Sequence, residues 1–256
     1  PGRAMVFLRL YNNTKNSTYL GLARQYIDYS LEHMTVTPTT QISFLESSNG
    51  VNALAAVIYS IQNQTEQSKE FIAAVITGFE NAHRSKEATY DTGKAGLLMT
   101  GKFLNNYFGI GTIPSSLIVQ VAEQILAAAT VDPTDGHLSW NNYVFKHIVF
   151  WGQGHGSTGV ITQLLDVPEI TQNATYSKMI ADTLDYYTTI QLPSGNFPTP
   201  EIEPYPLQPD ILVQWCHGSP GFIPVLTKGW SVYGNTKWLD SARKAADNVW
   251  EKGILT

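Results

Sequence analysis

Two glycine-rich segments contain the residues of this chain that are best suited to chemistry. The first is 151–159, which reads WGQGHGSTG, and the second is 215–221, which reads WCHGSPG. A histidine can donate or accept a proton near neutral pH, and a cysteine thiolate can bind a metal ion or attack an electrophile. The two segments therefore predict proton transfer at His155 and metal or thiol chemistry at Cys216.

Both histidines, His155 and His217, directly precede a glycine tetrad that is expected to open a helix. A helix N-terminus presents unsatisfied N–H groups and a partial positive charge, which favours a neutral imidazole and a thiolate. If several such helix starts gather at one opening of the fold, that opening would suit anionic or electron-rich ligands. The simpler interpretation is that each His-Gly pair only caps a helix and that Cys216 is a small buried residue. We favour the functional interpretation because the pattern occurs twice.

Other catalytic motifs fit this sequence less well. Residues 154–159 match the GxGxxG pattern of dinucleotide-binding folds, but residues 175–191 have helical rather than strand periodicity. Neither Ser157 nor Ser219 stands in a GxSxG string, and no HExxH, CxxC or phosphate-loop string occurs.

The elements that must position these residues form a repeat. Glycine-opened, apolar stretches begin at residues 50, 93, 156 and 218. Between them lie segments with helical periodicity and a polar opposite face, namely 20–34, 71–79, 117–125, 179–187 and 238–249. Strand signals are poor throughout. The sequence therefore predicts an all-α chain of repeated helical hairpins, which can stack as an open solenoid or close into a ring.

Composition excludes several classes of protein. The chain has 256 residues, 43% hydrophobic residues and a net charge of -5, without a basic stripe that would bind nucleic acid. No apolar run approaches the roughly 18 residues of a membrane-spanning helix. Cys216 is the only cysteine, so no internal disulfide can form, and we see no apolar leader. We expect a cytoplasmic protein, with peripheral attachment at the plasma membrane as a further option.

Glycosylation sequons begin at four asparagines, which we interpret as chance matches: Asn12, Asn16, Asn63 and Asn173.

The sequence resembles the LanC-like proteins, the eukaryotic relatives of the lantibiotic cyclases. The resemblance covers essentially the whole chain, and the WCHGSPG string is its most specific part. It is also carried by segments 154–159, 192–197 and 44–50, by the helix start at Ile113 and by the tetrad at 93–96. It implies a closed α/α toroid of seven helical hairpins, of which about five are present, in a single domain 1–256 that is incomplete at both ends.

The resemblance also implies a reaction, in which glutathione is added to dehydroalanine or dehydrobutyrine residues with the help of zinc. Carried over to this chain, Cys216 is a zinc ligand and His155 handles the proton. The two remaining zinc ligands of the family are expected beyond Thr256. Trp215 and His217 belong to the motif.

Two further residues are expected to contribute to substrate binding or to the motif, Asp91 and Lys94. The acidic residue expected four positions before Gly93 is absent, because Thr89 stands there. Asp91 and Glu87 are its nearest acidic neighbours. This departure puts the second polar role of the family's site in question.

Two alternatives remain open from the sequence. The first is a non-catalytic glutathione-binding or scaffold protein of the same fold. The second is a carbohydrate-active α/α barrel, in which two carboxylates should face each other across the mouth. Asp91, Asp135 and Glu201 are available for that role, although nothing pairs them in the sequence.

Overall fold

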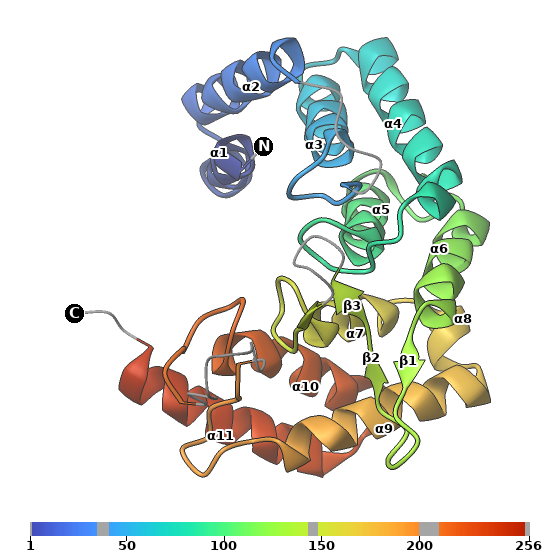
Figure 1. Ribbon diagram of the computed structural model, residues 1–256. Helices are drawn as coiled ribbons and strands as arrows, with labels where there is room; N and C mark the ends of the chain where they lie inside the picture. Colours follow the sequence, from blue (N-terminus) through green and yellow to red (C-terminus); the bar gives the residue numbers. More distant parts are fainter. Residues whose placement is uncertain (1, 35–40, 143–147, 200–209, 254–256) are drawn as a thin grey trace. The chain divides into compact units, whose positions relative to one another are not determined.

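The computed structural model describes residues 2–34, 41–142, 148–199 and 210–253 (Figure 1). Within these ranges the chain is mainly helical, as the periodicity predicts. The helices are α1 (Gly2–Thr14), α2 (Ser17–Glu32), α3 (Ser48–Ile61), α4 (Thr65–Glu80), α5 (Lys94–Phe108), α6 (Ser115–Ala127), α7 (Ser157–Leu164), α8 (Pro168–Thr171), α9 (Ala174–Thr189), α10 (Ser219–Tyr233) and α11 (Thr236–Lys252), with a 3-10 turn η1 (Ala82–Arg84). The described residues also form four strands of two residues each, β1 (Thr130–Val131), β2 (Leu138–Ser139), β3 (Asn141–Asn142) and β4 (Ile148–Val149).

The chain divides into two compact units. The first unit contains Pro1–Lys86 and Asp91–Val121, and the second contains Glu87–Tyr90 and Ala122–Thr256. The motif segments around His155 and Cys216 both belong to the second unit. Asp91 and Lys94 belong to the first unit.

In the first unit, α1 packs on α2 and α3 packs on α4, so that these helices form two hairpins. The glycine-opened helix α3 is the apolar one, with nine consecutive or near-consecutive buried residues from Asn49 to Ile58. A Cβ atom at Gly50 would lie 1.7 Å from the carbonyl oxygen of Phe44, so only glycine lets the preceding turn approach α3 this closely. The helix begins at Ser48, two residues before the tetrad, with Ser47 as its N-cap, so Gly50 lies in the first turn rather than at the cap.

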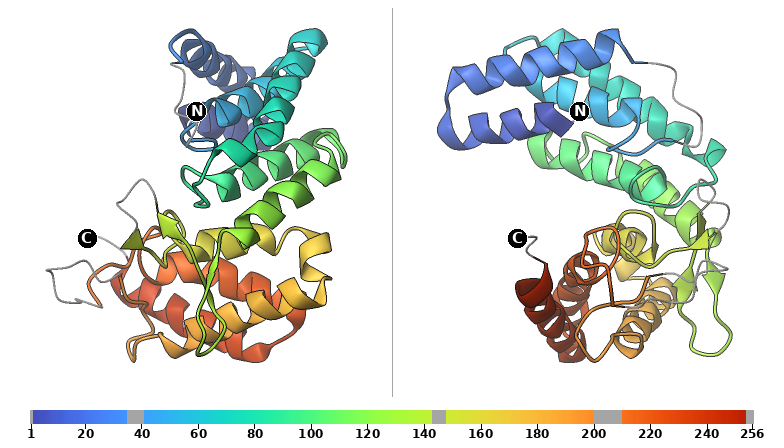
Figure 2. Two further views of the ribbon diagram at one scale, coloured as in Figure 1. Left: turned by 45° about the vertical axis from the view of Figure 1, so that its right-hand side comes forward. Right: turned by 60° about the vertical axis from the view of Figure 1, so that its left-hand side comes forward.

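In the second unit, α7 and α10 are the glycine-opened helices, and α7 is buried along its whole length. Helices α10 and α11 lie side by side as a hairpin (Figure 2). Gly234 closes this hairpin in the left-handed conformation, with φ of 78°, which glycine adopts without a steric penalty. Helices α7 and α9 both contact α10. The helix starts that follow His155 and His217 therefore belong to a packed helical core.

Three of the four sequon asparagines have a structural role. The side chain of Asn16 accepts a hydrogen bond from the Thr18 amide at the start of α2. Asn173 caps α9 in the same way, and Asn63 adopts a positive φ of 61° in the turn between α3 and α4. Asparagine is favoured both at helix N-caps and at positions with positive φ. These structural roles explain why asparagine stands at the three positions without invoking glycosylation.

The sequence analysis missed the four short strands. They pair as two antiparallel hairpins, β1 with β2 and β3 with β4. A two-residue strand is too short to show the alternation by which strands are recognised. Two hydrogen bonds join the β1–β2 hairpin to neighbouring helices. The Leu138 amide of β2 donates to the Thr183 hydroxyl of α9 (2.9 Å), and the indole of Trp140, which follows β2, donates to the Ile125 carbonyl of α6 (2.8 Å). Among the described residues, no helix combines the length and the apolar character needed to cross a bilayer.

Candidate functional site

The two motif histidines stand where the sequence places them, at the starts of α7 and α10. Gly156 is the N-cap of α7 and Gly218 is the N-cap of α10, so His155 and His217 each precede a cap by one residue. Gly218 has a φ of 97°, and a Cβ atom there would lie 2.1 Å from the Leu212 carbonyl oxygen. The glycine at this cap is therefore required by the backbone and by its surroundings.

The two motif segments contact each other directly, although they are far apart in the sequence. We call residues 151–156 the His155 turn and residues 214–218 the Cys216 turn. The Gln153 amide donates to the Trp215 carbonyl oxygen across them (3.3 Å). A Cβ atom at Gly154 would lie 3.3 Å from the Cβ atom of Cys216. The fold thus brings the two motifs into one site, which the sequence could only suggest.

The imidazole rings of His155 and His217 are neighbours, with centroids 6.1 Å apart. Phe150 packs against both of them, at 5.8 Å from each ring. The pKa of His217 is lowered, first by burial and then by the charge of His155. This shift favours the neutral imidazole at His217, and its first cause is burial rather than the helix start.

The Cys216 turn presents a thiol and an indole together. The Cys216 side chain is half-buried, and its thiol donates to Gln214 Oε1 at 3.7 Å. Trp215 is 43% exposed and packs edge to face on Tyr90, with centroids 5.8 Å apart. Burial raises the pKa of Tyr90. Tyr90 was missed by the sequence analysis, because it lies in a segment with no motif of its own.

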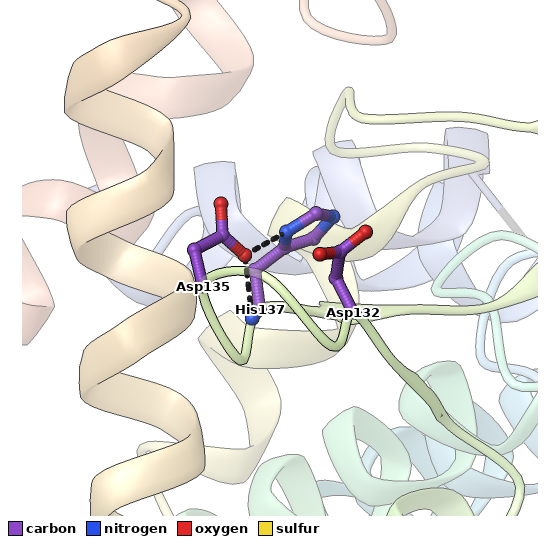
Figure 3. Close-up of side chains that lie close together, drawn as sticks. All are labelled: Asp132, Asp135 and His137. Carbon is purple, nitrogen blue, oxygen red and sulfur yellow. Dashed lines mark hydrogen bonds and ion pairs between the residues drawn. The ribbon is translucent and has the colours of Figure 1, made fainter.

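A zinc site at Cys216 requires more ligands than the described residues offer. A catalytic zinc ion takes about three protein ligands. Among the residues that the structure describes, the one group of three histidine, cysteine or carboxylate side chains with ligand atoms close together is Asp132, Asp135 and His137, whose atoms lie within 4.8 Å of one another (Figure 3). Cys216 is not part of such a group, so the described residues do not fit a three-ligand zinc site there.

The Asp132, Asp135 and His137 cluster lies in the loop between β1 and β2. His137 Nδ1 and Asp135 Oδ1 are 2.6 Å apart, and this hydrogen bond is the first cause that lowers the pKa of Asp135. The ring of His137 stacks on Tyr186 of α9, with centroids 3.8 Å apart and planes 9° apart. The sequence analysis named only Asp135 of this cluster. The Asp-Gly-His turn was the available signal, since Asp-Gly pairs mark tight turns.

Asp91 and Lys94 are buried residues of the first unit, each 5% exposed. The ammonium of Lys94 donates to the Ser85 carbonyl, and the hydroxyl of Ser43 donates to the Asp91 carbonyl. The roles of Asp91 and Lys94 in substrate binding stay predictions.

The residues considered for a carboxylate pair belong to different units of the chain or lie outside the described residues. Asp135 bonds to His137 in the second unit, while Asp91 belongs to the first. Glu201 lies outside the described residues. The carbohydrate alternative therefore gains no support from this geometry.

Comparison with known proteins identifies relatives along the whole chain. The family model described as lanthionine synthetase C-like protein matches residues 1–256. The LanC-like protein GCL1 of Arabidopsis thaliana is 28% identical over 265 residues, covering 99% of this chain and 59% of the relative. The glutathione S-transferase LANCL1 of Danio rerio is 25% identical over 260 residues, covering 99% of this chain and 62% of the relative. The chain thus spans about three fifths of the length of these curated relatives.

A solved structure has the same fold. Nisin cyclase matches with a TM-score of 0.68 at 14% sequence identity, covering 98% of this chain and 68% of that one. This likeness confirms the predicted α/α toroid class. Since the family model matches from the first residue to the last, the chain belongs to the lanthionine synthetase C-like family.

Proposed function

We propose that this chain is part of a thiol transferase that adds glutathione to dehydroalanine or dehydrobutyrine residues of a peptide or protein. The observation that carries the proposal is the direct contact between the His155 turn and the Cys216 turn, with the two imidazoles 6.1 Å apart. The name of the LANCL1 relative, a glutathione S-transferase at 25% identity, supports glutathione as the thiol.

The reaction needs one nucleophile and one proton. The sulfur of the glutathione thiolate bonds to the β-carbon of the dehydroamino acid, and the carbon–carbon π electrons move to the α-carbon and its carbonyl as an enolate. The α-carbon then takes a proton, so that the thiol hydrogen ends on carbon. A free thiol is a few per cent ionised near neutral pH and is a strong nucleophile.

In this proposal His155 is the proton carrier. It directly precedes the N-cap of α7, where the partial positive charge of the helix start favours the negative charge that develops on the enolate. His217 is held toward its neutral form by burial, so it places little competing charge beside His155. Trp215, which is 43% exposed, offers an apolar surface to the peptide.

Zinc has no step in this proposal, because the described residues do not supply three ligands at Cys216. Cys216 would provide one zinc ligand only where further ligands join it, and zinc bound there would lower the pKa of an incoming thiol.

The test is glutathione addition to a dehydroalanine-containing peptide, followed by mass spectrometry. We expect His155→Gln to reduce the rate by about 10²- to 10⁴-fold, the usual contribution of a general acid or base. His33→Gln is the matched control, because His33 is an exposed histidine at the end of α2, and it should keep the wild-type rate. An unchanged rate in His155→Gln would remove His155 from the mechanism.

A second candidate function is glutathione binding without turnover. It is favoured by the position of Cys216 outside any described group of three metal-ligating residues. Calorimetry of glutathione with the purified chain, with and without zinc, separates the two candidates. Binding that does not need zinc, in a chain that adds no glutathione to the peptide, supports this second candidate. A lack of binding in both conditions counts against both.

A further inference from the structure

An aromatic stack connects the β1–β2 loop to the His155 turn. The ring of His137 lies face to face on Tyr186, at 3.8 Å between centroids. Trp151, the first residue of the His155 turn, packs at an angle against both rings, at 5.7 Å from His137 and 5.2 Å from Tyr186. All three residues belong to the second unit. Trp151 is thus held by two aromatic rings from two different elements.

Asp135 fixes the orientation of the His137 ring. One carboxylate oxygen, Oδ1, lies 2.6 Å from His137 Nδ1 and accepts the His137 backbone amide at 3.1 Å. The carboxylate therefore holds both the main chain and the side chain of His137, as Figure 3 shows. His137 is 9% exposed, so the surrounding protein also limits its movement.

The backbone of Trp151 is tied to the helix start that carries His155. The Trp151 carbonyl accepts the Thr158 amide (3.0 Å), and the neighbouring Phe150 carbonyl accepts the Ser157 amide (3.0 Å). Inside the turn, the Gly156 amide donates to the Gly152 carbonyl (2.9 Å). A displacement of the Trp151 main chain would therefore break its hydrogen bond with Thr158 and loosen the turn that carries His155.

We infer that His137 is a positioning residue, which sets the orientation of His155 by fixing Trp151 at the start of the His155 turn. This role rests on the proposed function only in its consequence for catalysis. The positioning itself is a property of the second unit. Through it, a loop that carries no catalytic motif of its own would influence proton transfer at His155.

Hydrogen exchange of individual amides measures the positioning directly. The reporters are four amides that bond within the His155 turn or across it, those of Gln153, Gly156, Ser157 and Thr158. We expect His137→Ala to raise their exchange rates about tenfold, because an aromatic contact contributes on that scale. The amides of Leu192 and Gly195, which bond within a separate turn of the same unit, should keep their rates.

Two variants separate positioning from general destabilisation. His137→Phe keeps an aromatic face on Tyr186, so it should restore most of the protection that His137→Ala loses. Asp182→Asn removes the ion pair with Lys178 (2.6 Å) beside Gly136 and leaves the stack in place, so it should leave the four reporters unchanged. An equal rise at Leu192 and Gly195, or no rise at the four reporters, would overturn the inference.

The catalytic consequence is tested separately, by glutathione addition to the dehydroalanine peptide. His137→Ala should lower kcat by about tenfold, in step with the loosened turn, while KM for glutathione stays close to wild type. A wild-type chain that shows no addition contradicts the proposed function. The amide exchange of His137→Ala would still decide whether His137 positions the turn.

Discussion

Gly152 packs directly against the carbonyl group of Cys216, so that a Cβ atom at Gly152 would lie 1.8 Å from the Cys216 oxygen. A real Cβ atom cannot approach another atom this closely. The two turns that carry His155 and Cys216 therefore meet only because glycine stands at their contact. A second glycine allows a close approach nearby, because a Cβ atom at Gly221 would lie 3.0 Å from the Gln153 amide nitrogen of the His155 turn.

Gly152→Ala should separate the two turns. Because the added methyl group meets backbone atoms that cannot rotate away, we expect a loss of about 1–3 kcal/mol in the free energy of unfolding. Gly21→Ala is the control, since a Cβ atom there meets nothing within 4 Å and Gly21 lies inside α2. It should gain about 0.5–1 kcal/mol. Urea denaturation measures both, and equal effects of the two substitutions would contradict the contact.

Zinc content is the second prediction. Cys216 should hold far less than one zinc ion per chain, because the described residues offer no three-ligand group there. Elemental analysis of the purified 256-residue chain measures this, and Cys216→Ala should have the same zinc content as the wild type, since metal held by Asp132, Asp135 and His137 would not depend on Cys216. Near-stoichiometric zinc that disappears in Cys216→Ala would contradict the prediction. It would mean that ligands come from other residues or from a second copy of the chain.

The Asp135–His137 hydrogen bond should make stability depend on pH in the acid range. It lowers the pKa of Asp135 below the ordinary value of 3.8, so the folded state binds this proton less readily than the unfolded state. The stabilisation is complete above about pH 4 and is lost as the pH falls through the lowered pKa. Asp135→Asn should weaken this acid-range loss of stability.

Thermal unfolding between pH 2 and 6 measures the difference between wild type and Asp135→Asn. Asp240→Asn is the control, because it also removes an exposed carboxylate from the second unit, one that pairs with Arg243 at 2.9 Å. The variants are compared by the slope of the unfolding temperature against pH. Identical slopes in wild type and Asp135→Asn would show that the hydrogen bond does not stabilise the fold.

The cap of α9 predicts the effect of Asn173→Ala. The Asn173 side chain accepts hydrogen bonds from the amides of Thr175 (3.0 Å) and Tyr176 (3.2 Å). Its loss should cost about 1 kcal/mol of stability. Asn106→Ala, an exposed change inside α5, should be neutral or slightly stabilising because alanine has the higher helix propensity. Urea denaturation compares the two, and an equal effect at both positions would argue against the cap.

All the helices except α1 and the one-turn α8 were predictable from the sequence, because their determinants are local. Periodicity located α2, α4, α6, α9 and α11, and the glycine tetrads located α3, α5, α7 and α10. Each helix forms hydrogen bonds between residues four apart, so the pattern that specifies it lies within a few turns of chain. The hairpins β1–β2 and β3–β4 were missed because two residues carry no measurable alternation.

The site was predictable in its residues but not in its geometry. The sequence by itself determined that His155 and Cys216 each stand near a helix start, because Gly156 directly follows His155 and Gly218 follows Cys216 by two residues. Only the tertiary structure decided that the two turns touch, that burial lowers the pKa of His217, and that His137 supports Trp151. These contacts join residues distant in the chain. They depend on how α7, α9 and α10 pack together, which no local pattern encodes.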